Sequence, residues 1–274
     1  MTIAITLKVT DGLVVASDSA TTLGGGNTGN VYNNAEKVFN LVKGERVAAA
    51  ISGLGNIGPS SMASLIKDLR VLFRDDAKWR IDPKGYSVEE VAKKVKDFLF
   101  DEHYVPWHEV NAGKDRHNWP PFSMLMSGYS TSKSAPEIWQ LVFDKGKSNL
   151  TDLTHAPAAW IGNCEAINRL VLGFDARIIS ALTTSFGKTD AEVRDALKTA
   201  AFLEAQIIPG SMPIQDAVDL AYFLVDTSAK YSRYTPGYQT IGGPIDIATI
   251  TKHEGFKWVR RKHYYDARLN PERP

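Results

Sequence analysis

The sequence predicts an α+β fold, a four-layer αββα sandwich in which two stacked sheets lie between two layers of helices. The order of the periodic segments predicts it: four strands, two helices, several strands, two or three helices and two final strands. The early strands are joined by tight turns, and no Gly-x-Gly-x-x-Gly run opens a helix, which disfavours a doubly wound nucleotide-binding fold. We expect residues 1–260 to form one domain and residues 261–274 a polar C-terminal tail.

Composition narrows the class of protein. The 274 residues, of which 43% are hydrophobic, are enough for one large core. The net charge of +1 disfavours a nucleic-acid or anionic membrane partner. Cys164 is the single cysteine, so no intrachain disulfide can form. The chain starts without a basic leader, and no apolar run reaches the ~18 residues that a membrane span needs, so we expect a cytoplasmic protein.

The N-terminal segment has the pattern of a β-hairpin. Residues 3–9 alternate with period two, residues 10–12 have turn chemistry, and residues 13–19 are mostly apolar. The second strand ends at Asp18. A loop rich in Gly and Asn then leads to Lys37, which opens a strand at residues 38–42. Small and β-branched residues at 46–54 predict a fourth strand of the same sheet.

Two helices follow. Ser60 and Ser61 provide an N-cap for apolar residues that keep helical spacing from 62 to 73. Ser87 and Glu90 form a capping box for a second helix, which extends to residue 99. Residues 101–121, with three prolines, predict an insertion loop. Its His and Glu residues lack the spacing of a zinc site, so a metal site is the weaker interpretation, and we expect no cofactor.

The rest of the chain supplies the remaining layers. Strands are predicted at residues 122–128, 137–143 and 158–161, as the start of a second sheet. Helices are predicted at residues 164–185 and 190–208, and another begins near residue 212. Strands at 244–251 and 256–260 close the sheet. The Gly-rich run at residues 24–27 lies in a loop between strands and is a weak phosphate-binding candidate.

Thr2 carries the strongest chemical indication. Removal of Met1, which is expected where the second side chain is small, would place the α-amino group beside its own hydroxyl. An α-amine with a pKa near about 7.7–8.0 is partly unprotonated at neutral pH. It can therefore accept the proton of Thr2 Oγ1 as that oxygen attacks a carbonyl carbon. One residue would supply both nucleophile and base, close to the carboxylate of Asp18 and the ammonium of Lys37.

These residues also carry a family resemblance. Thr2, the turn Asp11-Gly12, the run Ala16-Ser17-Asp18-Ser19, the run Glu36-Lys37-Val38 and the small-residue strand at 48–53 resemble the start of a proteasome β-type subunit. That family belongs to the N-terminal-nucleophile (Ntn) hydrolases, and the chain is most similar to its bacterial, ancestral-β-subunit-like members. The resemblance covers residues 1–55 and returns at residues 242–250; between them only the element order agrees.

The resemblance implies a threonine-type peptidase or amidase. It assigns the nucleophile to Thr2, a tuning charge pair to Asp18 and Lys37, and an oxyanion-stabilising N–H to Ala50, where the family usually has glycine. Ala48, Ala49 and Thr21 are then candidate substrate-binding residues, because small side chains leave room for an apolar substrate group. A homo-oligomer of rings or stacked rings is implied, with an ATPase partner left unidentified. Trp107 and Trp119 are candidate interface residues.

Other interpretations stay open. Active family members carry Ser and Asp residues at supporting positions where this sequence has Asn163, Tyr238 and Ile241. A catalytically inactive assembly or binding subunit is therefore the alternative, and an acyl transferase is a variant of the enzyme hypothesis. A Ser-His-Asp hydrolase is disfavoured, because Ser17, Ser19 and Ser52 have no identifiable histidine partner.

Overall fold

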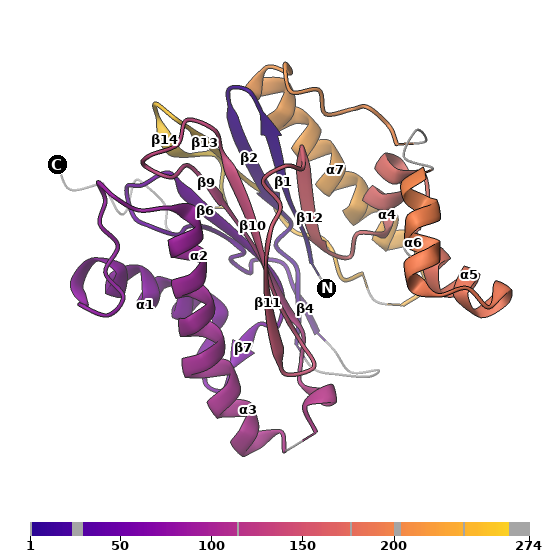
Figure 1. The fold of residues 1–274 in the computed structure, drawn as a ribbon, viewed down its shortest axis with the longest axis horizontal. Coiled ribbons are helices and arrows are strands. Elements are labelled where there is room, and N and C mark those ends of the chain that lie inside the picture. Colours follow the sequence, from indigo (N-terminus) through magenta and orange to yellow (C-terminus); the bar gives the residue numbers. More distant parts are fainter. Residues whose placement is uncertain are drawn as a thin grey trace.

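The structure is a computed structural model that describes residues 2–23, 30–113, 115–175, 177–199, 204–237 and 239–262. Within these residues, two five-stranded antiparallel sheets lie face to face. Helices cover the outer face of each sheet (Figure 1). This is the αββα sandwich that the element order predicts.

The first sheet has the order β12-β1-β2-β13-β14. Its strands are β1 (Ile3–Val9), β2 (Gly12–Ser17), β12 (Ala158–Gly162), β13 (Asp246–Thr251) and β14 (Gly255–Arg260). The predicted N-terminal hairpin is present, and Ala4 pairs with Ser17 at its open end. Strand β1 lies between β12 and β2, so the chain start is held by strands on both sides.

The second sheet has the order β11-β10-β9-β6-β5. Its strands are β5 (Val38–Asn40), β6 (Val47–Gly53), β9 (Phe122–Gly128), β10 (Glu137–Asp144) and β11 (Lys147–Asp152). The assignment of residues 38–54 to the first sheet was therefore wrong. Periodicity identifies a strand, but its neighbours are chosen by packing; here β6 pairs with β9, which is far away in sequence.

Two short hairpins lie where the sequence predicted loops. One joins β3 (Thr21–Leu23) to β4 (Asn30–Tyr32), and its tip at residues 24–29, with the predicted Gly-rich candidate, is outside the described residues. The other joins β7 (Asn56–Ile57) to β8 (Ser60–Ser61). Both lie in the connections that lead the chain toward and away from β5 and β6.

Small side chains fill the space between the sheets. Ala4 and Val15 of the first sheet share a buried cluster with Ala48 and Ala50 of the second. Strand β1 alternates, with Ile3, Ile5 and Leu7 on the helix-covered face. Alanines at the interface let the two sheets approach closely.

The helices on the second sheet are continuous where a loop was predicted. After α1 (Met62–Asp75), capped by Ser61, α2 (Val88–Lys96) is capped by Ser87, which accepts the Glu90 N–H. A π-helical segment (Asp97–Tyr104) and α3 (Val105–Asn111) then extend α2. Residues 101–111 are therefore helical, with a proline tolerated in the first turn of α3. Tyr104, His108 and Trp119 are buried together, which explains the aromatic composition by packing.

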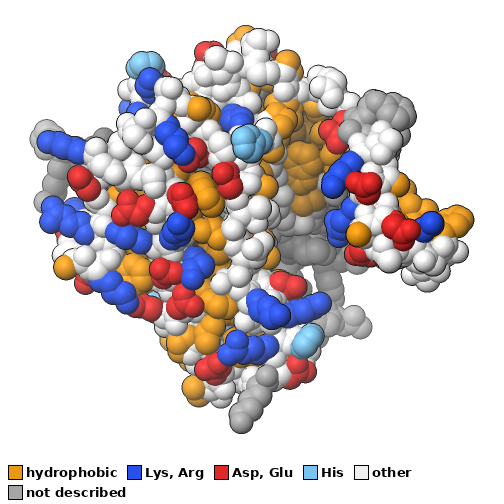
Figure 2. All heavy atoms as spheres, in the orientation of Figure 1, with side chains coloured by type: hydrophobic (Ala, Val, Ile, Leu, Met, Phe, Trp, Pro, Cys, Tyr) orange, Lys and Arg blue, Asp and Glu red, His pale blue; other side chains and the backbone are white. Residues whose placement is uncertain are grey.

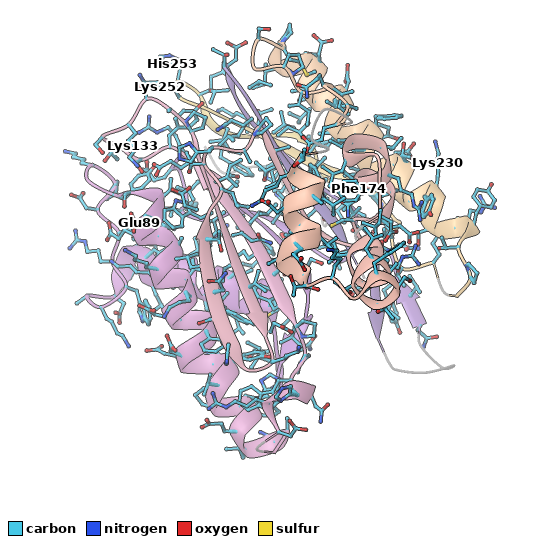
Figure 3. The ribbon with its side chains drawn as sticks, turned by 45° about the vertical axis from the view of Figure 1, so that its right-hand side comes forward. Glu89, Lys133, Phe174, Lys230, Lys252 and His253 are labelled. Carbon is cyan, nitrogen blue, oxygen red and sulfur yellow. The ribbon has the colours of Figure 1, made fainter. Side chains whose placement is uncertain are left out.

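The other helix layer is interrupted twice. The predicted helix at 164–185 consists of α4 (Glu165–Ile167), a π-helical turn (Asn168–Leu172) and α5 (Arg177–Phe186). Gly173 breaks it with φ +82°, and Phe174 follows at the bend (Figure 3). Helix α6 spans Asp190–Thr199. Of its predicted extension, residues 200–203 lie outside the described residues, and residues 204–208 are not helical, so the predicted end at residue 208 was wrong.

Helix α7 (Ile214–Tyr234) packs on the first sheet through residues that include Ala217, Ala221 and Leu224. Helices α5 and α6 form an arm at one side of the molecule, and apolar side chains gather at its outer end (Figure 2). None of the helices described here is long and apolar enough to cross a membrane.

The start of the predicted tail is packed. Arg261 and Lys262 contact acidic side chains of the body, at Glu36 and Asp246. The remaining tail, residues 263–274, is outside the described residues, as is Met1.

The end of β12 gives a test of how tightly the chain start is held. Gly162 has φ +99°, and a Cβ there would lie 1.9 Å from the carbonyl oxygen of Thr2. We expect Gly162→Ala to lower the free energy of unfolding by about 2–3 kcal/mol. The backbone conformation at this φ is strained for alanine, and the added Cβ would displace Thr2. Urea unfolding measures this. Gly210→Ala, where a Cβ would contact nothing within 4 Å, is the control, and equal stability of the two variants would contradict this account.

Candidate active site

Thr2 lies at the start of β1, directly between the neighbouring strands of the first sheet. It is 6% exposed, and its carbonyl oxygen accepts the N–H of Asn163 at 2.7 Å. Side chains alternate along a strand, so Thr2 shares with Ala4 the face that looks toward the second sheet. The Thr2 side chain is therefore directed at the end of β6, between the two sheets.

Asp18 follows β2 and is 1% exposed. Its Oδ1 accepts the Ile3 N–H at 3.1 Å and the Lys37 ammonium at 2.8 Å. Its Oδ2 accepts the N–H groups of Ala20 at 3.1 Å and Gly242 at 3.0 Å. Four donors thus satisfy both oxygens of this buried carboxylate.

Lys37 precedes β5 and is 5% exposed. Its Nζ donates to Asp18 Oδ1 and to the carbonyl oxygen of Ala20. Burial lowers the pKa of Lys37 from its ordinary value of 10.5, while the Asp18 carboxylate acts in the opposite direction and raises it. The sequence-predicted charge pair is thus formed, and its partners fix the position of the ammonium group.

A cavity of about 280 Å³ brings these residues together. It is lined by three of the candidate residues from the sequence, Thr2, Lys37 and Thr21. Its other lining residues come mainly from two segments and from the start of α1: Ala35, Glu36, Ile51, Ser52, Gly53, Leu54, Gly55, Asn56, Ser61, Met62 and Ala63.

Ala48, Ala49 and Ala50 are placed elsewhere. All three are fully buried, and none lines the cavity. The N–H of Leu54 donates to the carbonyl oxygen of Pro121, and the N–H of Tyr129 donates to the carbonyl oxygen of Arg46. With the register of β6 and β9, these bonds show that the even-numbered residues of β6 are the ones hydrogen-bonded to β9. In that register Ala50 exchanges hydrogen bonds with Leu125 of β9. Its N–H is committed to the sheet, so the expected oxyanion role of Ala50 has no geometric basis.

Gly53 has the geometry that Ala50 lacks. The N–H of Ile51 bonds to Lys37, so odd-numbered residues of β6 direct their N–H groups toward the β5 side. Strand β5 starts only at Val38, and at Gly53 this side of β6 faces the cavity that Thr2 and Lys37 line. The sequence signal for this position is the pair of small residues Ser52-Gly53 at the end of the strand.

The supporting positions differ from the active family pattern. Asn163 accepts the Glu165 N–H through its side chain and donates its main-chain N–H to Thr2. Ile241 is buried in the helix-covered core, and Tyr238 lies outside the described residues. Ser52 also lines the cavity, and its hydroxyl lies near Thr2. Both flank Gly162, because a Cβ built on Gly162 would lie 2.8 Å from Ser52 Oγ and 1.9 Å from the carbonyl oxygen of Thr2.

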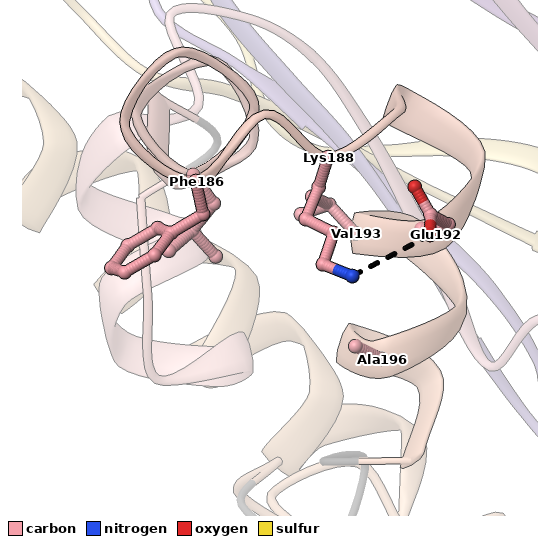
Figure 4. Close-up of a pocket in the computed structure, with 6 residues that line it drawn as sticks. Phe186, Lys188, Glu192, Val193 and Ala196 are labelled. Carbon is pink, nitrogen blue, oxygen red and sulfur yellow. Dashed lines mark ion pairs between the residues drawn. The ribbon is translucent and has the colours of Figure 1, made fainter.

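A larger cavity, of about 470 Å³, lies in the α5–α6 arm (Figure 4). It is mostly apolar, with Phe186 and Val193 in its wall and an ion pair of 3.6 Å between Lys188 and Glu192. The described residues that line it include no Ser, Thr or Cys. Among the described residues, no group of three or more His, Cys, Asp or Glu side chains is arranged to hold a metal ion.

Comparison with known proteins places the fold. No family model matches the sequence, and no curated protein matches it either. Solved structures match over nearly the whole chain. The Anbu (Gly-1) mutant from Hyphomicrobium sp. strain MC1 is 15% identical with a TM-score of 0.54, covering 96% of this chain and 86% of that one. This chain has the Anbu fold.

Two other Anbu structures agree. Anbu (ancestral beta-subunit) from Yersinia bercovieri is 12% identical with a TM-score of 0.53, over 96% of this chain and 89% of its own. The Anbu complex from Pseudomonas aeruginosa, solved as a helical assembly, is 16% identical with a TM-score of 0.54, over 97% and 90%. The predicted αββα fold of an ancestral-β-subunit-like protein is thus confirmed. The roles of individual residues rest on the geometry described above.

The buried charge pair gives a prediction about stability and pH. Asp18→Asn leaves the Lys37 ammonium buried without its partner, so we expect the free energy of unfolding at pH 7 to fall by about 3 kcal/mol. Loss of the Asp18 charge also lowers the pKa of Lys37 further in the folded state. The folded variant then releases this proton at a lower pH than the folded wild type does. The deficit relative to wild type should therefore shrink as pH rises above the Lys37 pKa of the folded variant, and should stop shrinking at the Lys37 pKa of the folded wild type, which itself lies below 10.5.

Urea unfolding at several pH values measures this deficit. Asp226→Asn is the matched control, because Asp226 pairs with Lys230 at the surface of α7 and exposed pairs contribute about 0–1 kcal/mol. A deficit for Asp18→Asn that matches the control, or that grows with pH, would contradict the buried pair.

Proposed function

We propose that the protein is a threonine-type N-terminal-nucleophile hydrolase that cleaves a peptide or amide bond through Thr2, after removal of Met1. One observation carries this proposal. Thr2 and Lys37 line the same cavity of about 280 Å³. The Lys37 ammonium donates a hydrogen bond to the Asp18 carboxylate, which fixes its position. The Anbu fold supports it, because that fold is a proteasome-like Ntn hydrolase fold.

In the proposed reaction, Thr2 Oγ1 attacks the carbonyl carbon and the α-amine of Thr2 accepts its proton. The positive charge of Lys37 disfavours protonation of that amine beforehand and so favours its basic form. The negative oxygen of the tetrahedral intermediate accepts the Gly53 N–H, an interaction worth about 3–4 kcal/mol when preorganised. The protonated α-amine of Thr2 then gives its proton to the leaving amine as the C–N bond breaks, which leaves an ester on Thr2 Oγ1. Water, deprotonated by the same α-amine, attacks this ester, and the proton returns to Thr2 Oγ1 as the C–O bond breaks and the acid leaves.

The wall of the cavity indicates the substrate. Ile51, Leu54 and Met62 supply apolar surface, while Asn56 and Ser61 are polar. We therefore assign this space to an apolar side chain next to the cleaved bond, with backbone polar groups of the substrate meeting the polar rim.

A covalent probe tests the mechanism. We expect a β-lactone or epoxyketone to add one equivalent to Thr2, in protein whose intact mass shows that Met1 is absent. Thr2→Ala should abolish labelling and keep the circular dichroism spectrum, because its hydroxyl is the reacting group. Intact-mass and peptide mass spectrometry measure both.

Thr10→Ala, in the exposed turn after β1, is the matched control and should be labelled like the wild type. If wild-type protein with a free Thr2 amine resists several such electrophiles and cleaves no amide, the inactive assembly or binding subunit becomes the better account. Labelling of a protein that retains Met1 would exclude the α-amine as the base.

We also propose that the working form is a homo-oligomer. The Anbu complex from Pseudomonas aeruginosa forms a helical assembly. In this chain α5 has no buried residue, and Phe186 at its end is 69% exposed. The expected interface role of Trp119 was wrong, because Trp119 is buried in the core under α3. The apolar α5–α6 arm is a better candidate for contact between copies.

Light scattering coupled to gel filtration tests this assembly. We expect the wild type to elute as an oligomer and Phe186→Asp to shift to a smaller mass, since a charge in an apolar contact is strongly unfavourable. Val110→Asp is the control, because Val110 is 83% exposed on α3, away from the arm. A monomeric wild type would refute the oligomer, and dissociation by the control alone would place the interface elsewhere.

A further inference from the structure

A second buried ion pair lies beside the Asp18–Lys37 pair. Asp246, at the start of β13, is 2% exposed, and the side chain of Lys262 is 8% exposed. Lys262 contacts Asp246 twice: its main-chain N–H donates to Oδ1 at 2.9 Å and its ammonium to Oδ2. The proposed reaction makes no use of either residue.

The pair reaches the candidate active site through Ser19. The Lys262 ammonium donates to Ser19 Oγ at 2.8 Å, and this hydroxyl donates to the carbonyl oxygen of Pro244 at 2.6 Å. The main chain of Ser19 is also fully used. Its N–H bonds to Gly242 O, and its carbonyl oxygen accepts the N–H of Ala35, which lines the cavity.

Ser19 therefore joins two segments that hold Asp18. The N–H of Ala20, the next residue, and the N–H of Gly242 are the two donors to Asp18 Oδ2. The turn after Gly242 has little freedom, because a Cβ at Gly243 would lie 2.4 Å from Asn33 O. A shift of Ser19 would consequently move both donors away from the Asp18 carboxylate.

The charges are coupled as well. Burial chiefly lowers the pKa of Lys37 and Asp18 raises it; the positive charge of Lys262 lowers it further and Asp246 raises it. Two carboxylates and two ammonium groups thus form a nearly neutral buried group, in which loss of one charge is felt by the others.

We propose that Lys262 is a positioning residue of the candidate active site, which fixes Ser19 and the turn at Gly242 so that both N–H groups stay on Asp18 and Lys37 stays beside Thr2. This inference rests on the proposed function of Thr2. Lys262 touches no reacting atom; it acts through Ser19, Asp18 and Lys37.

The test compares Lys262→Met with Lys262→Arg in saturation kinetics of labelling by a β-lactone, followed by intact mass. For Lys262→Met we expect the limiting rate of acylation to fall about 10- to 100-fold, as for small displacements of catalytic groups. The half-saturating concentration should be unchanged and the end point should remain one equivalent. Lys262→Arg, which keeps the charge, should recover part of the rate.

Lys257→Met, exposed on β14, is the matched control and should react like the wild type. An unchanged limiting rate in Lys262→Met would overturn the proposal. So would a reduced end point with an unchanged rate, because that pattern means fewer folded molecules. If Lys262→Met does not fold, the double variant Asp246→Asn with Lys262→Met removes both buried charges and must show the same fall in rate.

Hydrogen exchange separates this inference from the proposed function. In Lys262→Met, the amides of Ala20 and Gly242 should exchange faster than in wild type, while that of Leu7 in β1 should not change. If wild-type protein is never acylated, the proposed function fails and amide exchange alone decides the positioning role: unchanged exchange at both amides overturns it.

Discussion

The buried carboxylate of Asp18 is the constraint on which the rest of the site depends. It collects an N–H from β1, one from its own turn and one from the segment before β13, together with the Lys37 ammonium. An uncompensated carboxylate in this position would cost several kcal/mol, so these segments are stable only when they arrive together. Assembly of the candidate site and closure of the fold are therefore the same event.

The narrow space between the sheets is the second requirement. Ala4, Ala48 and Ala50 lie between the sheets, where larger side chains would force them apart. This close approach lets β6 end beside the start of β1, with Gly53 and Thr2 at one cavity. Ala48, a substrate-binding candidate from the sequence, thus serves the site indirectly, by setting the distance between the two sheets, while Ala49 packs in the core on the other face of β6.

The local patterns of the sequence predicted most of the secondary structure. Period-two and helical spacing located most strands and helices, and Ser61 and Ser87 cap α1 and α2 as expected. The resemblance to proteasome β-type subunits implied a charge pair between Asp18 and Lys37, which the structure contains. Three findings depend on register and long-range packing: the sheet to which β5 and β6 belong, the position of Gly53 rather than Ala50 at the cavity, and the contacts of Lys262. None of these leaves a periodic signal in the sequence.

Three of the four donors to Asp18 are main-chain N–H groups, a feature with an evolutionary consequence. Every residue except proline has a main-chain N–H, so this donor is kept after almost any substitution. The need to hold Asp18 therefore places little constraint on which amino acids occupy these positions. Mutations can accumulate along such a chain while the carboxylate keeps its surroundings. Identities of only 12–16% to proteins of the same fold are compatible with this construction. The requirements of such a site are recorded in the path of the backbone and leave little trace in the choice of amino acids.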